Sequence, residues 1–263
     1  MPIDILAVMK HAADTVIMPR WRSLSDDQVE EKNPGDLVTV ADRESEQVIT
    51  AELRSAHPKA MILGEEAYAA DPGILEDFQR AEHAFTVDPI DGTSNFVHGS
   101  RDFAVMVAEL RAGDVVRSWI WQPAHGVAYE AEAGAGATRN GAVLPRRELD
   151  PDTATWRGAT ARRGLLARDH VPLAQLREAA WCCGVDYPHV ATGDLDYLVY
   201  SKVWPWDHAP GSLLVREIGG RSIRKDGSSY SPAAPIGRWL LAGADASAPT
   251  ALSYLEADLT EEN

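Results

Sequence analysis

The stretch Asp88-Pro89-Ile90-Asp91-Gly92-Thr93 is the most informative part of the chain. It follows the apolar run AFTV (84–87), which predicts a strand, and precedes Ser94-Asn95-Phe96, which predicts the start of a helix. Pro89 fixes its own φ and lets both aspartates face one point, while Gly92 lets the backbone approach a ligand. Amides of Gly92 and Thr93 at a helix N-terminus would suit a phosphate oxygen. Taken alone, the stretch is more typical of an exposed Asx turn.

Three further segments bring acidic side chains to the ends of predicted elements. Gly64-Glu65-Glu66 follows the apolar run AMIL (60–63) and offers the hard oxygen ligands that Mg²⁺ uses. Asp207 in Trp206-Asp207-His208-Ala209-Pro210-Gly211 precedes a predicted helix, where capping is the simpler role. Thr39 and Asp42 resemble a helix capping pair. Capping or a solvated loop explains each segment singly, but the four together indicate a carboxylate site.

The overall charge restricts the partners. The 263 residues suffice for one large domain or two packed halves, and their formal net charge is −15. Such a charge repels phosphate backbones and anionic lipid, so we expect neither a nucleic-acid polymer nor a membrane as a partner. A small phosphorylated metabolite would still need local positive charge, which clustered carboxylates supply by binding divalent metal.

Cysteine usage and the N-terminus favour a cytoplasmic protein. The two cysteines, Cys182 and Cys183, are adjacent, a spacing that rarely permits a disulfide, so we expect buried thiols in a reducing compartment. The start Met1-Pro2-Ile3-Asp4 has no basic region, and no stretch approaches the roughly 18 apolar residues of a membrane span.

Periodicity predicts an α/β (α+β) fold. Apolar residues at helical spacing predict helices over 3–21 and 41–56. Three consecutive strand-like segments from Phe103 to Glu132, with a hairpin turn at Asn140-Gly141, predict an antiparallel meander. In the second half the pattern predicts helices around 172–180, over 207–219 and from 248, with strands at 196–200 and near 221 and 238.

Together the four acidic segments resemble the inositol monophosphatase family of metal-dependent phosphatases. The match runs through D-x-V-T-x-x-D (Asp36, Thr39, Asp42), G-E-E, D-P-I-D-G-T and W-D-x-A-x-G. The resemblance implies a layered α-β-α-β-α sandwich of the sugar-phosphatase type. It also implies a metal site between an N-terminal half (1–150) and a C-terminal half (151–263), inhibition by lithium, and a homodimer.

The same resemblance implies a ligand set and a mechanism. Glu65, Asp88 and the Ile90 carbonyl would hold one Mg²⁺, and Asp88, Asp91 and Asp207 a second. Glu65 would also serve a weaker third site, giving two or three ions. Metal would activate the attacking water and steady the leaving alkoxide. Thr93 and Asp42, with Glu65, would orient and deprotonate that water, and no covalent nucleophile is needed.

Substrate contacts implied by the resemblance are Asp91, Gly92, Thr93, Ala180, Tyr200 and Asp207. Two positions depart from members that act on inositol phosphates: Arg177-Glu178-Ala179-Ala180 replaces G-S-A-A, and Tyr200 replaces a glutamate. The run YSKVWPW (200–206), with Lys202, offers aromatic faces and a cation for a planar or more anionic leaving group, unless it is ordinary packing. Inositol phosphates, histidinol phosphate, sugar bisphosphates and 3′-phosphonucleotides all stay candidates.

Two other hypotheses compete with this one. Haloacid-dehalogenase phosphatases use D-x-D-x-T with a nucleophilic first aspartate, but here two residues separate Asp88 from Asp91, and no basic-plus-DD pattern follows. A non-catalytic relative that binds phosphorylated ligands is the third hypothesis, although this chain retains every expected ligand. The histidines form no zinc pattern, which disfavours a zinc enzyme.

Overall fold

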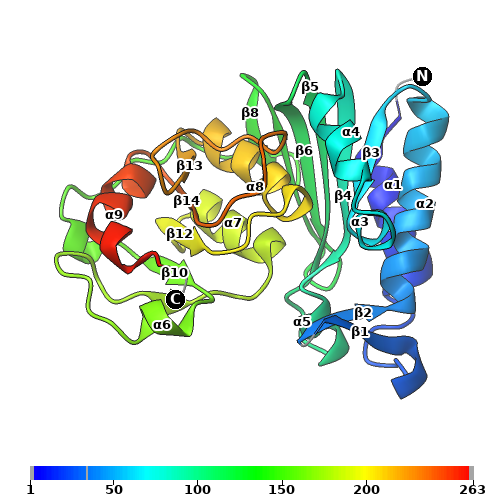
Figure 1. Ribbon diagram of the computed structural model, residues 1–263, viewed down its shortest axis with the longest axis horizontal. Helices are drawn as coiled ribbons and strands as arrows, with labels where there is room; N and C mark the ends of the chain where they lie inside the picture. Colours follow the sequence, from blue (N-terminus) through cyan, green and yellow to red (C-terminus); the bar gives the residue numbers. More distant parts are fainter. Residues whose placement is uncertain (1–2, 34, 261–263) are drawn as a thin grey trace.

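The computed structural model describes residues 3–33 and 35–260, and the side chain of Asp36 lies outside the described part, as do Met1 and Pro2. Figure 1 shows the layers. Helices α1 (Ile5–Ala12) and α2 (Val40–Ala56) cover one face of a seven-stranded sheet, and α7 (Cys183–Thr192) and α8 (Pro205–Glu217) cover the other. A five-stranded sheet follows, with α9 (Ser247–Leu255) on its outer side. The predicted α-β-α-β-α sandwich is confirmed.

The larger sheet contains the predicted meander. Its order is β3 (Met61–Gly64), β4 (His83–Asp91), β5 (Ala104–Arg111), β6 (Asp114–Gln122), β7 (Val127–Glu132), β8 (Gly136–Arg139) and β9 (Ala142–Val143). Only β3 and β4 pair in parallel, because α3 (Glu65–Ala70) and α4 (Ile74–Arg80) cross between them. Their register pairs Gly64 with Val87. The next residues, Glu65 and Asp88, therefore lie side by side at the C-terminal end of the two strands.

The smaller sheet is built from the second half. Its order is β11 (Arg177–Glu178), β10 (Gly158–Thr160), β12 (Tyr197–Tyr200), β14 (Leu240–Gly243) and β13 (Arg221–Arg224). Short elements complete the fold: the hairpin β1 (Val29–Asn33) and β2 (Asp36–Thr39), with α5 (Thr93–Val97) and α6 (Arg163–Leu166). The predicted division near residue 150 stays a prediction. No helix among the described residues is long and apolar enough to cross a membrane.

The N-terminal helices form where caps and apolar stripes coincide. Asp4 caps α1 by accepting from the Ala7 amide, and Ile5 and Met9 bury one face of that helix. Thr39 and Asp42 form a reciprocal capping box at the start of α2, as the sequence predicted. Buried apolar residues of α2 then pack against β4, which fixes Asp42 beside the end of that strand.

The helix predicted around 172–180 is wrong. Arg177 and Glu178 instead form the edge strand β11, parallel to β10, and the Ala179 amide donates to the Thr160 carbonyl. Pairing with the second sheet outweighs local propensity there. The helix begins only at Cys183. The helix predicted from Asp207 begins two residues earlier, at Pro205, whose fixed φ suits a first helical position.

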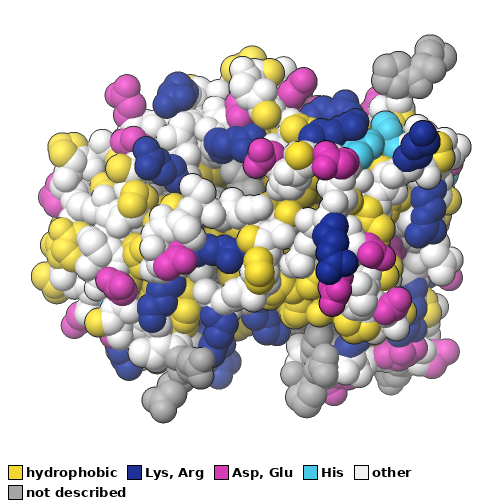
Figure 2. All heavy atoms as spheres, turned by 45° about the horizontal axis from the view of Figure 1, so that its top comes forward, with side chains coloured by type: hydrophobic (Ala, Val, Ile, Leu, Met, Phe, Trp, Pro, Cys, Tyr) yellow, Lys and Arg dark blue, Asp and Glu magenta, His cyan; other side chains and the backbone are white. Residues whose placement is uncertain are grey.

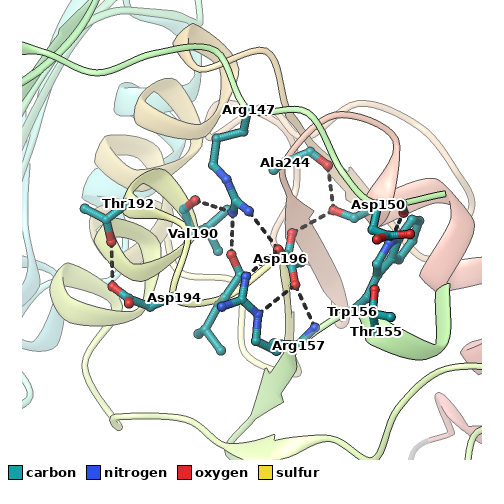
Figure 3. A network of polar contacts seen from close by, with 12 residues as sticks. Arg147, Asp150, Thr155, Trp156, Arg157, Val190, Thr192, Asp194, Asp196 and Ala244 are labelled. Atoms are coloured by element: carbon teal, nitrogen blue, oxygen red, sulfur yellow. Dashed lines mark hydrogen bonds and ion pairs between the residues drawn. The ribbon is translucent and has the colours of Figure 1, made fainter. Parts of the chain in front are cut away.

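The segment that links the two sheets is held by the charge network of Figure 3. Arg147 donates to Asp196 Oδ1 at 2.8 Å, to the carbonyl of Val190 in α7, and to the carbonyl of Leu195 in the loop that follows that helix. Arg157 donates to the other oxygen of the same carboxylate through its amide and its Nε. These guanidinium and amide donors hold the pKa of Asp196 below its usual value against the opposing effect of burial.

Acidic and basic side chains intermingle on the surface. On the face drawn in Figure 2, Lys and Arg alternate with Asp and Glu and do not gather into one basic patch. This face offers no continuous positive surface to a nucleic-acid backbone.

Candidate metal centre

Glu65 and Asp88 meet because they follow parallel strands that end at one sheet edge. Glu65 opens α3 directly after β3, and Asp88 lies near the end of β4. The start of α3 is fixed by Glu46, whose carboxylate accepts from the amides of Glu66 and Ala67. A β-carbon at Gly64 would lie 2.3 Å from that carboxyl group, so a larger residue there would displace Glu46 from the two amides.

The motif itself bends the chain from strand to helix. Pairing of β4 with β5 shifts between Asp88 and Asp91, so both carboxylates leave the regular alternation of the strand. Gly92 then adopts φ 80°, and a β-carbon there would lie 3.0 Å from the Asp102 carbonyl oxygen. The helix α5 follows from Thr93. Gly92 is therefore required both for its left-handed conformation and for lack of space.

Asp207 does not cap its helix. The N-cap of α8 is Trp204, and Asp207 lies in the first helical turn without a capping bond. The capping interpretation of Asp207 is thus wrong. The carboxylate instead lines the same cavity as Glu65 and Asp88.

These segments enclose a cavity of about 470 Å³. Its lining includes every predicted metal ligand and the two phosphate-binding residues. The lining residues are Gly35, Leu37, Glu65, Asp88, Ile90, Asp91, Gly92, Thr93, Ser94, Asn95, Trp181 and Asp207. Of the other predicted substrate contacts, Ala180 and Tyr200 are not among the lining residues.

The cavity concentrates negative charge. Asp88 is 2% exposed, and its Oδ1 has no hydrogen-bond partner in the described part of the protein. Burial, followed by the charges of Glu65, Asp91 and Asp207, raises the pKa of Asp88 well above its usual value. Burial likewise raises the pKa of Glu65 to about 8, against the effect of Lys32. Such a cluster is stable as carboxylates only with a cation beside it.

The donor set fits a hard divalent cation. Glu65, Asp88, Asp91 and Asp207 supply carboxylate oxygens, and Ile90 also lines the cavity, with its carbonyl 2.9 Å from the Thr93 hydroxyl. Oxygen-only ligands of this kind suit Mg²⁺ and are poor ligands for zinc. Lys32 contributes an ion pair at the rim, with its Nζ 2.8 Å from Glu65 Oε1 and 2.6 Å from Glu66 Oε1.

Asp42 and Thr93 form the pair that the resemblance implied. The Thr93 hydroxyl lies 3.1 Å from Asp42 Oδ1 and 2.9 Å from the Ile90 carbonyl, so its single proton can be donated to either. The other Asp42 oxygen accepts from the amide and hydroxyl of Thr39. Burial, opposed by these hydrogen bonds, raises the pKa of Asp42 to about 6. The carboxylate is therefore largely ionised at neutral pH.

Asp91 is positioned by residues that the sequence did not single out for this role. Its Oδ2 accepts from the Cys182 thiol at 3.0 Å and from the Gly184 amide. A side chain at Gly184 would meet the Ala104 β-carbon at 2.4 Å. The segment next to the site is therefore 181–184. Arg177 and Glu178 are exposed on the edge strand, so the predicted G-S-A-A equivalent, 177–180, begins four residues too early.

Tyr200 lies behind the site, in an aromatic cluster. Its ring stacks on Tyr187 with a centroid distance of 5.6 Å and lies 4.7 Å from the His208 ring. His208 Nε2 donates to the Lys202 carbonyl and its Nδ1 accepts from the Tyr187 hydroxyl, so both nitrogens are engaged. The neighbouring group of Cys183, Asp207 and His208 thus has no free imidazole for a metal.

Lys32, Glu46, Cys182 and Gly184 are the contributors that sequence reasoning missed. Lys32 stands directly before the sequence Asn33-Pro34-Gly35, and the small residues of Cys182-Cys183-Gly184 follow the segment chosen as G-S-A-A. Both stretches carried a local signal. Lys32 contacts Glu65, 33 positions along the chain, and Gly184 contacts Asp91, 93 positions away. A local sequence pattern does not reveal contacts over such separations.

Comparison with known proteins shows the family of the chain. The model of the inositol monophosphatase family matches residues 3–257. An inositol-1-monophosphatase of Mesorhizobium japonicum is 38% identical over 244 residues, which cover 85% of this chain and 86% of that protein. The Nus factor SuhB of Pseudomonas aeruginosa is 33% identical over 209 residues, covering 73% of each.

Solved structures show the same fold. An IMPase of Thermotoga maritima superposes with a TM-score of 0.81 at 26% identity and covers 98% of this chain and 96% of its own. The sequence motifs, the layered fold and these relatives agree. The chain belongs to the inositol monophosphatase family and is a phosphoric monoester hydrolase.

Proposed function

We propose that the protein hydrolyses a small phosphorylated metabolite in a Mg²⁺-dependent reaction. The observation that carries this proposal is the cluster of Glu65, Asp88, Asp91 and Asp207 around one cavity, with an unpartnered oxygen on Asp88. A buried group of this charge has no structural purpose without a cation.

Mg²⁺ would be held by these four carboxylates and the Ile90 carbonyl, in two or three sites bridged by Asp88, and would supply Lewis acidity for the phosphoryl oxygens and the leaving group. Gly92 and Thr93 offer backbone amides at the start of α5 to a phosphate oxygen. Because that helix is a single turn, we expect directed hydrogen bonds from these amides to matter more than any helix dipole.

Thr93 and Asp42 would orient the attacking water. While the Thr93 hydroxyl donates its proton to Asp42, its lone pairs are free to accept from a water in the cavity. Asp42 favours that arrangement because the carboxylate is the stronger acceptor when ionised. Glu65 borders the same cavity and is proposed to take part in removing the proton of the water.

The identity of the alcohol stays open between inositol phosphates, histidinol phosphate, sugar bisphosphates and 3′-phosphonucleotides. A second cavity of about 770 Å³ shares Glu65 and Asp207 with the first and contains Lys202, Trp204 and Trp206. The two indoles stack with an interplanar angle of 4°. They contact Tyr68 as well, so this aromatic group has a packing role of its own.

A phosphate-release screen of these four substrate classes, with and without Mg²⁺, tests the proposal. We expect Mg²⁺-dependent release from at least one class and its loss in Asp91→Asn. Asp114→Asn, at the exposed first residue of β6, is the matched control. Absence of release from every compound would contradict the proposal and favour the non-catalytic alternative, and unchanged turnover in Asp91→Asn would contradict the role of Asp91 as a metal ligand.

Three finer features remain predictions. We expect inhibition by millimolar lithium, which full activity in lithium would contradict. A homodimer is expected from the resemblance, and light scattering measures it. Fractionation of cells tests the expected cytoplasmic location.

A further inference from the structure

Trp181 is the one large apolar side chain on the lining of the site cavity that is mostly open to solvent, among the residues described. It lines the cavity and is 53% exposed. Its φ is 59°, a left-handed conformation that β-carbons disfavour and that glycine adopts freely. A bulky residue in this conformation beside a reactive site indicates a function that offsets the strain.

The residues on both sides of Trp181 are held by hydrogen bonds. The Ala180 amide donates to Asp186 Oδ1 at 2.8 Å, and the Ala180 carbonyl accepts from Asn95 Nδ2 at 2.8 Å. On the other side the Cys182 thiol donates to Asp91. Trp181 is therefore held between helix α5, through Asn95, and the proposed metal ligand Asp91. These contacts fix its position relative to the metal centre.

The indole offers only ring surface to the cavity. Its single polar atom, Nε1, already donates to Glu178 Oε1 at 3.1 Å. What remains is an aromatic face and edge, which bind a planar π-system better than a saturated polyol. The hydrogen bond also limits rotation of the side chain.

Trp181 lies on the side where the alcohol of the substrate is expected. Asp42 approaches the cavity from α2, on one face of the seven-stranded sheet, and Trp181 directly precedes α7, on the opposite face. In-line displacement places the leaving alcohol opposite the attacking water. Because Asp42 and Thr93 are proposed to orient that water, the alcohol faces the α7 side.

Charge at the cavity narrows the substrate further. None of the described lining residues of this cavity is a lysine or an arginine. Lys32 and Lys202 line the adjoining cavity of about 770 Å³, so a second phosphate beside Trp181 would meet carboxylates and an indole. The cavity therefore suits an alcohol that carries no further phosphate.

We propose that Trp181 selects monophosphate esters whose alcohol bears an aromatic ring, by stacking against that ring. This inference rests on the proposed phosphatase function. It favours aryl-bearing or nucleoside monophosphates over inositol phosphates and sugar bisphosphates.

Benzyl phosphate and cyclohexylmethyl phosphate form a matched pair of probes, because both are primary-alcohol esters of similar size and differ in aromaticity. We expect the KM of the wild-type protein to be about tenfold lower for the benzyl ester. In Trp181→Leu the ratio of the two KM values should approach one, and in Trp181→Phe it should largely return. Tyr254→Leu, an exposed aromatic residue on α9, is the control and should keep the wild-type ratio.

Equal KM values for the two esters in the wild-type protein would overturn the proposal. So would a KM ratio in Trp181→Leu that is the same as in the wild type. Calorimetric binding of benzylphosphonate and cyclohexylmethylphosphonate with Mg²⁺ separates this failure from that of the proposed function. A binding preference that Trp181→Leu removes, without turnover of any ester, would refute the hydrolytic function and retain ring recognition. A change of oligomeric state in Trp181→Leu with an unaltered preference would make Trp181 an interface residue and overturn the inference.

Discussion

Asp88→Asn should change the stability of the protein in opposite directions with and without Mg²⁺. The carboxylate is buried, one of its oxygens has no partner in the described structure, and the nearby charges of Glu65, Asp91 and Asp207 oppose its ionisation. Removing one charge from such a group should raise the free energy of unfolding of the metal-free protein by about 2 kcal/mol. For a chain of this size, that corresponds to an increase of roughly 4–8 °C in Tm.

Bound metal should reverse the order. An ion at a concentration one hundred times its Kd stabilises the folded state by about 2.7 kcal/mol, so two ions should raise the wild-type Tm by roughly 10–20 °C. Asp88 is the proposed bridging ligand, and its replacement should remove most of this gain. Asp88→Asn is then more stable than the wild type in EDTA and less stable in saturating Mg²⁺.

Differential scanning calorimetry in EDTA and over a series of Mg²⁺ concentrations measures both effects. Asp114→Asn, which removes the exposed aspartate that begins β6, controls for net charge. A Tm of Asp88→Asn below that of the wild type in EDTA would refute the account of charge repulsion. An equal Mg²⁺-induced shift in the two proteins would refute the role of Asp88 as a ligand.

Three further changes test other parts of the site and fold. Thr93→Val should lower kcat by about 100-fold in steady-state phosphate release, whereas Thr93→Ser should keep most of the activity. Equal rates for the two variants would contradict the water-orienting role of Thr93. Cys182→Ala should raise the Mg²⁺ concentration for half-maximal activity by roughly tenfold, because Asp91 loses a hydrogen-bond donor, whereas Cys182→Ser should not. The same Mg²⁺ dependence of activity in the wild type and both variants would contradict this role of Cys182. Asp196→Asn should lower the free energy of unfolding at pH 7 by about 3 kcal/mol in urea titrations. Since the folded pKa of Asp196 is depressed, this contribution is present above its unfolded pKa near about 4 and is lost as the pH falls through the folded value; a pH-independent difference would contradict the ion-pair account.

Parts of the site that depend on strand ends were predictable from the sequence. Glu65 and Asp88 each follow an apolar strand, and parallel strands bring their ends to one edge, so a local pattern was sufficient. The capping box of Thr39 and Asp42 was predictable for the same reason, because all its contacts lie within four residues.

What the sequence could not provide depends on tertiary pairing. The segment 172–180 contains no strong strand signal, yet Arg177 and Glu178 within it form an edge strand because β10 offers a partner. The contact of Cys182 and Gly184 with Asp91 joins two halves of the chain and shifts the site-facing segment by four residues. A left-handed tryptophan at 181 has no sequence signature, since glycine is the residue that usually marks such a position.

Anomalous diffraction from crystals grown with Mn²⁺ in place of Mg²⁺ tests most directly whether the stretch Asp88–Thr93 forms a metal centre. We predict strong anomalous peaks within coordination distance of Asp88, with Glu65 and the Ile90 carbonyl on one ion and Asp91 and Asp207 on another. A map that has no peak beside Asp88, from crystals whose solution holds Mn²⁺ well above the concentration for half-maximal activity, would contradict the account.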